Sequence, residues 1–257
     1  MNKNLVLPLL PLVALLMWTT AAEGQTASPL NDARAAFKAN DLTKAAALLE
    51  PLTGADATDA AAFHTLSQVR LAQRNAPQAI ELAEKATALD ATKPEYFSQL
   101  GMALGQRMGE LSFMQQGALA GKLRKAFAKA VELDPNNLPG LIGLARFYAS
   151  APEIAGGSIE KAKEFAVRVQ RLDPFQGELE LGGVAEHDEN YAEALEHYEA
   201  AAKLKSGQAW AQYLCGRALA KLGRKDEARV QFEAALKISP ALDAARKGLA
   251  GLDAPAP

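Results

Sequence analysis

The sequence predicts an all-α protein, an α-solenoid of about six helix hairpins followed by a C-terminal capping helix. Three observations support this prediction: the composition, small side chains that recur at a fixed spacing, and polar turns that precede them. Ala and Leu, both strong helix formers, dominate the apolar residues of the 257-residue chain, which is 49% hydrophobic. Aromatic residues make up only 6%, so strands are disfavoured.

The charges of the chain argue against two classes of partner. Lys and Arg number 28, Asp and Glu number 30, and the two kinds are interspersed along the sequence. Binding of nucleic acid or of an anionic membrane surface would require a basic patch, and none is visible. We therefore expect neither partner.

Residues 1–22 have the order of a secretory signal segment. Lys3 precedes the uncharged apolar run 5–18, and the small residues of 20–22 form a cleavage site. The run contains two prolines and is shorter than the about 20 residues that a membrane-spanning helix needs. This segment predicts an exported protein, periplasmic or secreted, with no stable membrane span after cleavage. An uncleaved membrane anchor is the alternative.

A polar turn that leads into a helix with a small Ala in its first turn recurs along the chain. The clearest instances are at Ala45, Ala79, Ala194 and Ala228. The first two are 34 residues apart (79 − 45), as are the last two (228 − 194). Small residues at these positions let two antiparallel helices approach to about 8–10 Å. Bulky residues follow four positions later, at Leu49, Tyr198 and Phe232, and fill the space between neighbouring hairpins.

With this period the chain resembles the tetratricopeptide-repeat family, and the resemblance covers nearly everything after the signal segment. It implies that each unit is a helix hairpin and that the hairpins stack around a concave groove. A single hairpin cannot bury its apolar face alone, so stacking is required. The expected organisation is a signal segment at 1–22, hairpin units at 26–59, 60–93, 94–137, 138–174, 175–208 and 209–242, a capping helix at 243–252 and a flexible tail at 253–257. An insert, the run Ala126–Pro135 and a Gly-Gly turn also resemble a group of exported bacterial repeat proteins.

Two units depart from the regular period. The third spans 44 residues (137 − 94 + 1) because the insert 105–121 lies between its two helices. Its apolar residues Leu111, Phe113 and Met114 either extend the first helix and pack on the neighbouring unit, or form a flap with partner contacts over the groove entrance. The fourth unit has an enlarged turn at 150–158, which we interpret as tight glycine geometry before a helix N-cap.

Motifs of enzymes and metal sites are not found in the sequence. It contains no Gly-x-Ser-x-Gly, no dinucleotide fingerprint and no His-Glu-x-x-His. Its three histidines have no helical i, i+4 ligand spacing, and Cys215, the sole cysteine, lies among apolar residues of a helical stretch. We expect no catalysis, no cofactor and no metal.

The resemblance also implies which residues line the groove, namely first-helix residues that point away from the hairpin partner. These positions hold Arg34, His64, Gln68, Gln99, Met102, Arg146, Tyr213 and Arg217. The Lys and Asn pairs with which some family members clamp a C-terminal carboxylate are not reproduced. The three arginines would make a modestly basic lining, suited to an acidic or C-terminal peptide segment. Alternatively, all of these are ordinary solvated side chains.

The leading hypothesis is a non-enzymatic adaptor of the cell envelope that binds a peptide or protein partner in its concave groove. It predicts that replacing Arg146 and Arg217 with Ala weakens partner binding and leaves the melting curve unchanged. One alternative is a structural subunit of an envelope assembly, or a homo-oligomer, that uses the 105–121 insert as its contact. Another is a small-molecule or lipid carrier.

Overall fold

The computed structural model describes residues 28–253, and in that range the protein consists of thirteen α-helices and two short 3-10 helices, with no strand. The predicted all-α solenoid is confirmed. The helices are α1 (Pro29–Lys38), α2 (Leu42–Leu49), α3 (Ala60–Ala72), α4 (Ala76–Leu89), α5 (Pro94–Gly109), α6 (Phe113–Leu133), α7 (Leu138–Ser150), α8 (Ile159–Leu172), α9 (Pro174–His187), α10 (Tyr191–Leu204), α11 (Ala209–Lys221), α12 (Lys225–Ile238) and α13 (Asp243–Leu252).

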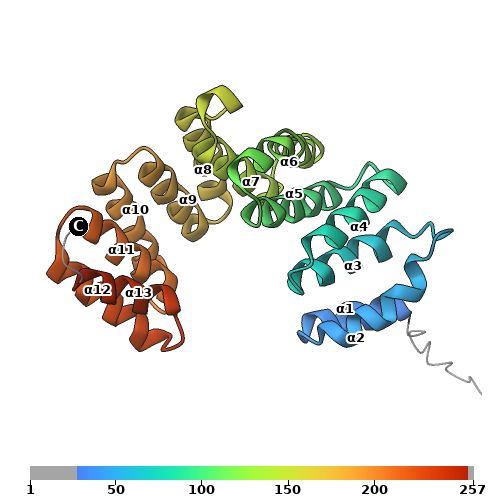
Figure 1. Ribbon diagram of the computed structural model, residues 1–257, viewed down its shortest axis with the longest axis horizontal. Coiled ribbons are helices and arrows are strands. Elements are labelled where there is room, and N and C mark those ends of the chain that lie inside the picture. Colours follow the sequence, from blue (N-terminus) through green and yellow to red (C-terminus); the bar gives the residue numbers. More distant parts are fainter. Residues whose placement is uncertain (1–27, 254–257) are drawn as a thin grey trace, which may run out of the picture.

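The helices form antiparallel pairs that stack in chain order. Each helix packs mainly on the helices before and after it in the sequence. Figure 1 shows the stack bent into an arch, with α3, α5, α7 and α9 on the inner side and α4, α6 and α8 on the outer side. The first helix of each hairpin therefore supplies the concave face.

Small residues occupy the positions where the helices cross. The Ala in the first turn of the second helices is fully buried in each regular unit, at Ala45, Ala79, Ala194 and Ala228. Glycines on the first helices receive an aromatic ring. A Cβ at Gly182 would lie 2.4 Å from the Tyr198 ring, and one at Gly216 would lie 2.7 Å from Phe232. Because even a methyl group would clash there, the close approach of the paired helices depends on these residues.

The turn inside the regular hairpins has one repeated geometry. The residue just before the cap of the second helix has a positive φ, and these residues are Asn40, Arg74, Glu189 and Gly223. In three of the four turns the following Asp or Asn side chain accepts a hydrogen bond from the backbone N–H three residues later, as Asp41 does from Lys44 at 3.0 Å. This bond satisfies a free donor of the helix N-terminus and sharpens the helix start.

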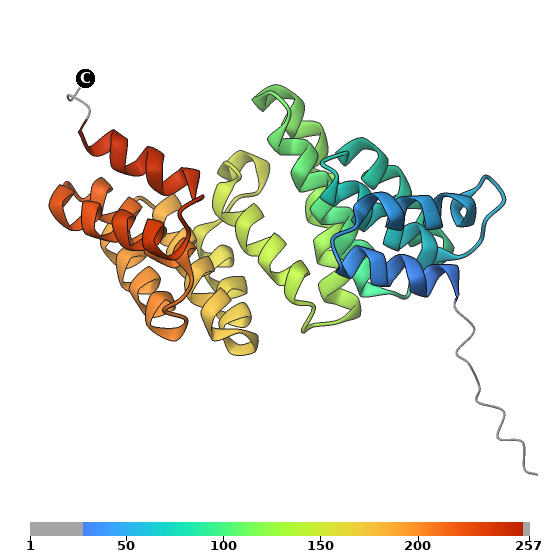
Figure 2. The same cartoon turned by 90° about the horizontal axis from the view of Figure 1, so that it is seen from below.

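The third hairpin differs from the sequence-based prediction. The stretch 105–121 is not a separate insert, because α5 continues to Gly109, α6 begins at Phe113, and only a short turn separates them. Both helices are lengthened, and Figure 2 shows the green tip of this hairpin reaching beyond its neighbours. Leu111 lines one pocket together with Pro77 and Ile80 of α4. The interpretation that Leu111, Phe113 and Met114 extend the first helix is therefore wrong, because Leu111 lies in the turn after α5 and the other two begin α6. The side chains of Phe113 and Met114 lie outside the described part of the structure.

The enlarged turn of the fourth hairpin contains the 3-10 helix η2 (Glu153–Ala155) and two glycines with distinct roles. Gly156 has φ of 90°, in the left-handed region. At Gly157 a Cβ would lie 1.8 Å from the carbonyl oxygen of Ala151. Ser158 then accepts a hydrogen bond from the Lys161 N–H at 3.2 Å, which confirms its role as the N-cap of α8.

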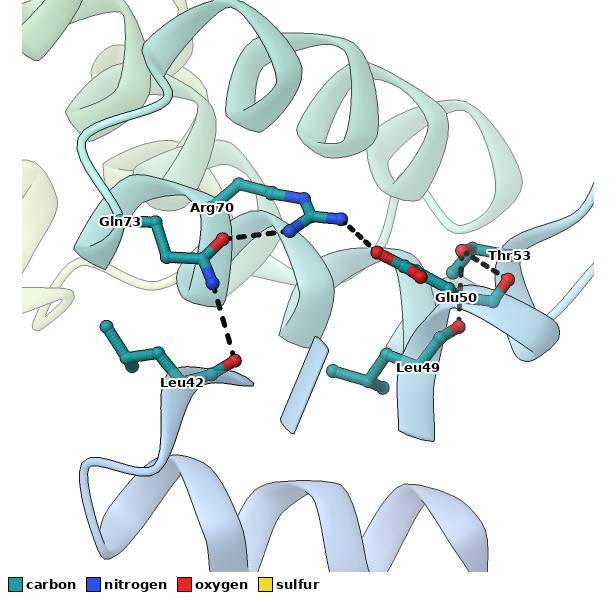
Figure 3. A network of polar contacts seen from close by, with 6 residues as sticks. All are labelled: Leu42, Leu49, Glu50, Thr53, Arg70 and Gln73. Carbon is teal, nitrogen blue, oxygen red and sulfur yellow. Dashed lines mark hydrogen bonds and ion pairs between the residues drawn. The ribbon is translucent and has the colours of Figure 1, made fainter. Parts of the chain in front are cut away.

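The first hairpin is joined to the second by polar contacts. α2 is short and continues into the 3-10 helix η1 (Glu50–Thr53). Figure 3 shows Arg70 of α3 between Gln73 and the carboxylate of Glu50, while Gln73 reaches the carbonyl of Leu42 at 3.4 Å. These contacts connect both ends of α2 to α3, in addition to the core cluster that the buried apolar residues of the two helices share.

Two of the predicted segments fall outside the described residues. The proposed signal segment 1–22 and the end of the tail, 254–257, are not described. Within 28–253, no helix is both long and apolar enough to cross a membrane.

Candidate functional site

The candidate site is a pocket on the concave face between α7, α9 and α11, which we call the central groove. Its volume is about 490 Å³, and its lining includes Arg146, Glu180, Gly183, Glu186, Trp210 and Arg217. α9 and α11 approach each other less closely than α7 and α9 do, so the stack is open at this point. The groove therefore brings together two of the predicted site residues, Arg146 and Arg217.

One wall of the central groove is an ion pair between α7 and α9. Arg146 donates from Nε to Glu180 Oε2 at 2.9 Å and from Nη2 to Oε1 at 2.6 Å. Gln176, one turn earlier on α9, donates to the same Oε1 at 2.6 Å. Glu180 is only 5% exposed, so its charge depends on these three donors. The hydrogen bonds to Glu180 raise the pKa of Arg146.

The other wall is a similar pair between α9 and α11. The Nε of Arg217 donates to Glu186 Oε1 at 2.9 Å, and its Nη2 bonds Oε2. The Tyr198 hydroxyl also donates to Oε2, at 2.7 Å. Burial, and next the hydrogen bond to Glu186, raise the pKa of Tyr198 well above its ordinary value. One helix, α9, thus supplies the carboxylate for both arginines.

These pairs change the expected charge of the groove. Arg146 and Arg217 are not free cations, because Glu180 and Glu186 compensate them. Replacing both arginines with Ala would leave two poorly solvated carboxylates without their main donors, at a cost of about 1–3 kcal/mol each. We therefore expect this double replacement to lower the melting temperature, in contrast to the expectation from the sequence alone. The two glutamates were missed, although Glu180 lies one 34-residue period after Arg146 (180 − 146).

Gln99 is a second correction. It was predicted to face the groove, but it is only 2% exposed and unavailable to a partner. Its Nε2 donates to Ser67 Oγ at 3.0 Å, and the Ser67 hydroxyl donates to the Ala79 carbonyl at 2.8 Å. A buried amide needs such partners, so Gln99 links α5 to the second hairpin.

The other predicted residues lie on the first three inner helices, away from the central groove. Arg34 on α1 and Met102 on α5 are exposed, and Gln68 on α3 is half-buried. The ring of His64 stacks on Tyr96 with centroids 4.7 Å apart. Burial lowers the pKa of His64 to about 4, and its Nδ1 has no partner in the described structure.

Aromatic residues extend the site along α11. Tyr213 packs against Trp210 with ring centroids 4.9 Å apart, and against Phe232 at 5.9 Å. Trp210 is 47% exposed at the edge of the central groove. Trp210 was not among the predicted site residues, although an exposed aromatic residue next to a groove position is a typical partner contact.

Within the described residues, the side chains outside the central groove form neither a metal site nor a reactive thiol. In residues 28–253, no group of three or more His, Cys, Asp or Glu side chains could hold a metal ion. Cys215 is buried, and that burial raises the pKa of its thiol to about 12. A thiol that stays protonated is a weak nucleophile.

Comparisons with known proteins agree with this architecture. A family model described as tetratricopeptide repeat matches residues 187–252. Curated protein sequences give no match. PilW, a type IV pilus biogenesis factor, has a similar structure with a TM-score of 0.68 at 15% identity, covering 86% of this chain and 96% of PilW.

Two further structures are similar at low identity. In the APC/C hetero-tetramer Cut9–Hcn1, the TM-score is 0.67 at 14% identity over 88% of this chain, and the chain spans only 42% of the length of that one. The C-terminal part of a repeat protein from Cytophaga hutchinsonii gives 0.54 at 17% identity, with 87% and 95% of the two chains covered. These likenesses show the fold alone.

The match at 187–252 and the stacked hairpins of the remaining described chain identify the class. Residues 187–252 match the tetratricopeptide-repeat family, and the described chain as a whole has the fold of a tetratricopeptide-repeat solenoid. This fold generally serves as a scaffold for protein–protein interaction.

Proposed function

We propose that this protein is a non-enzymatic scaffold that binds an extended segment of a partner protein in the central groove. The observation that supports this most directly is an open groove whose charged walls are internally paired while Trp210 stays half exposed. Such a groove offers an apolar contact without requiring the partner to neutralise buried charge.

The paired walls also favour binding by preorganisation. Arg146 with Glu180 and Arg217 with Glu186 restrain long side chains that would otherwise have to be ordered when a partner binds. Each rotamer-rich side chain immobilised on binding costs about 0.5–1.5 kcal/mol. A groove whose walls are already ordered avoids part of that cost.

We further propose that the protein acts in the cell envelope. The support is the charged, apolar and small-residue order of residues 1–22, which is typical of an export signal. Fractionation of the source cells tests this. Full-length protein in the cytosol, with the segment retained, would contradict it.

Gly183 provides a direct test of the groove. A Cβ there meets no atom within 4 Å, so a larger side chain would project into the groove without disturbing the core. Gly121 on α6 is equally open and lies outside the central groove. Gly183→Leu should therefore block binding, while Gly121→Leu serves as the matched control.

The ligands for this test are peptides selected on the wild-type protein from a random display library, then synthesised and titrated by fluorescence anisotropy. We expect Gly183→Leu to weaken them at least about tenfold, as loss of a central contact does. Gly121→Leu should bind like wild type. A selection that yields no 1:1 ligand, or ligands that bind Gly183→Leu normally, would rule out the groove as the binding site.

A further inference from the structure

A second pocket continues the concave face beyond Arg217, between α11, α12 and α13. We call it the C-terminal groove, and its volume is about 650 Å³. Tyr213 and Leu252 contribute apolar surface to its lining, and α13 also presents the small residues Ala244, Gly248 and Gly251 there. A Cβ at Gly251 meets nothing within 4 Å, so the groove is open at α13. Because Arg217 lines both pockets, the two grooves are adjacent along α11.

All charged residues that line the C-terminal groove are basic. Its lining includes Lys221, Lys225 and Lys247, all exposed, together with Arg217 and no acidic residue. In the described chain none of the three lysines is in an ion pair. No carboxylate of the described residues compensates these lysines, in contrast to the arginines of the central groove, and Lys221 lies over the Tyr191 ring at 5.7 Å from its centroid.

Two acidic residues near the C-terminal groove, Asp253 and Asp243, already have other partners. Asp253 is close enough to Lys225 for that lysine to lower its pKa, but its carboxylate pairs with Arg229, which is the main cause of the lowering. Asp243 pairs with Arg246. The positive charge of the lysines is thus available to a ligand.

We infer that the C-terminal groove binds an acidic stretch of the partner segment, with an apolar side chain of that segment on the Tyr213 side and carboxylates at Lys221, Lys225 and Lys247. Charge complementarity selects this occupant, because three unpaired cations around an apolar groove favour a ligand that has both carboxylates and an apolar residue. The inference rests on the proposed function and adds the chemistry of the partner. An anionic membrane is disfavoured because the lysines surround a groove between helices, and a flat bilayer surface cannot enter such a groove.

The test uses three fluorescein-labelled peptides of equal length with a central Leu-Leu pair. Their other positions are Asp and Glu in the first peptide, Asn and Gln in the second, and Lys in the third. The variant is Lys221→Gln, Lys225→Gln and Lys247→Gln combined. The matched control removes three exposed lysines elsewhere, Lys38→Gln, Lys125→Gln and Lys203→Gln.

We expect wild-type protein to bind the acidic peptide about tenfold more tightly than the amide peptide, with the difference shrinking as salt is raised. The C-terminal-groove variant should lose this preference, and the control should keep it. Equal binding of the acidic and amide peptides, or equal loss in both triple variants, would overturn the inference. So would lysine-dependent binding to vesicles of equimolar phosphatidylcholine and phosphatidylglycerol without binding of the acidic peptide.

The two proposals can fail separately. Library ligands that depend on Gly183 and show no acidic preference would overturn the charge inference and leave the proposed function intact. Failure of the library to yield any ligand would remove the proposed function instead.

Discussion

At the scale of single residues, Gly182 and Gly183 on α9 face opposite surroundings. Gly182 faces the hairpin partner, where the Tyr198 ring would meet a Cβ at 2.4 Å. Gly183 faces the central groove, where a Cβ meets nothing. The first glycine is needed for packing, whereas the second weakens the helix and keeps the groove open.

Alanine at these two positions should change stability in opposite directions. Gly182→Ala should destabilise the protein by about 1–3 kcal/mol because of overpacking. Gly183→Ala should stabilise it by about 0.5–1 kcal/mol because Ala is the better helix former. Urea unfolding followed by circular dichroism measures both. Equal effects of the two substitutions would contradict the packing described for α9.

His64 should make stability depend on pH. Its pKa is lowered to about 4 from the ordinary 6.5, chiefly by burial, with Glu95 acting to raise the pKa and Arg34 to lower it. Between these two values the unfolded chain binds more protons than the folded one, so stability falls as pH drops from about 6.5 to 4. One pKa unit corresponds to about 1.4 kcal/mol, so the loss is at most about 3.5 kcal/mol.

The measurement compares wild type with His64→Phe, which keeps an aromatic ring against Tyr96. Urea midpoints at pH 7 and pH 5 should differ less in the variant than in wild type. The same pH dependence in both proteins would show that other groups are responsible.

At the scale of elements, α13 has two tasks. It covers the last hairpin, since a Cβ at its Gly248 would lie 2.7 Å from Phe232, and its buried Ala245 and Leu252 belong to the same core cluster as Phe232. It also forms one side of the C-terminal groove. A stacked array of hairpins needs a terminal helix with a polar outer face, because the apolar face of the last hairpin would otherwise be exposed to water.

Deletion of residues 243–257 should therefore expose the apolar face of α11 and α12. We expect faster amide hydrogen exchange in these two helices and little change in α3 and α4, because hairpins contact mainly their neighbours. Exchange followed by mass spectrometry measures this. Uniform loss of protection along the chain would contradict nearest-neighbour stabilisation.

At the scale of the whole molecule, polar links join the inner helices of successive hairpins. Ser67 and Gln99 join α3 to α5, Arg146 and Glu180 join α7 to α9, and Glu186 and Arg217 join α9 to α11. The first link is neutral and the other two are ionic. The concave face consequently has compensated charge in the central groove and unpaired lysines in the C-terminal groove, which is why we assign different ligands to the two grooves.

The sequence by itself determined the hairpins, their order and the capping helix, because small residues at a 34-residue spacing specify where helices cross. It also predicted that Arg146 and Arg217 share the concave face. It did not predict that α5 and α6 are both lengthened by the extra residues of the third unit, since an irregular period does not show where one helix ends and the next begins.

Which charges are free depends on how the helices are arranged in space. Glu180 and Glu186 neutralise the predicted arginines, and Gln99 lies in the core, because hydrogen bonding and burial depend on distances between helices that periodicity does not encode. The lysines around α13 became visible as a group only when the last three helices were placed side by side.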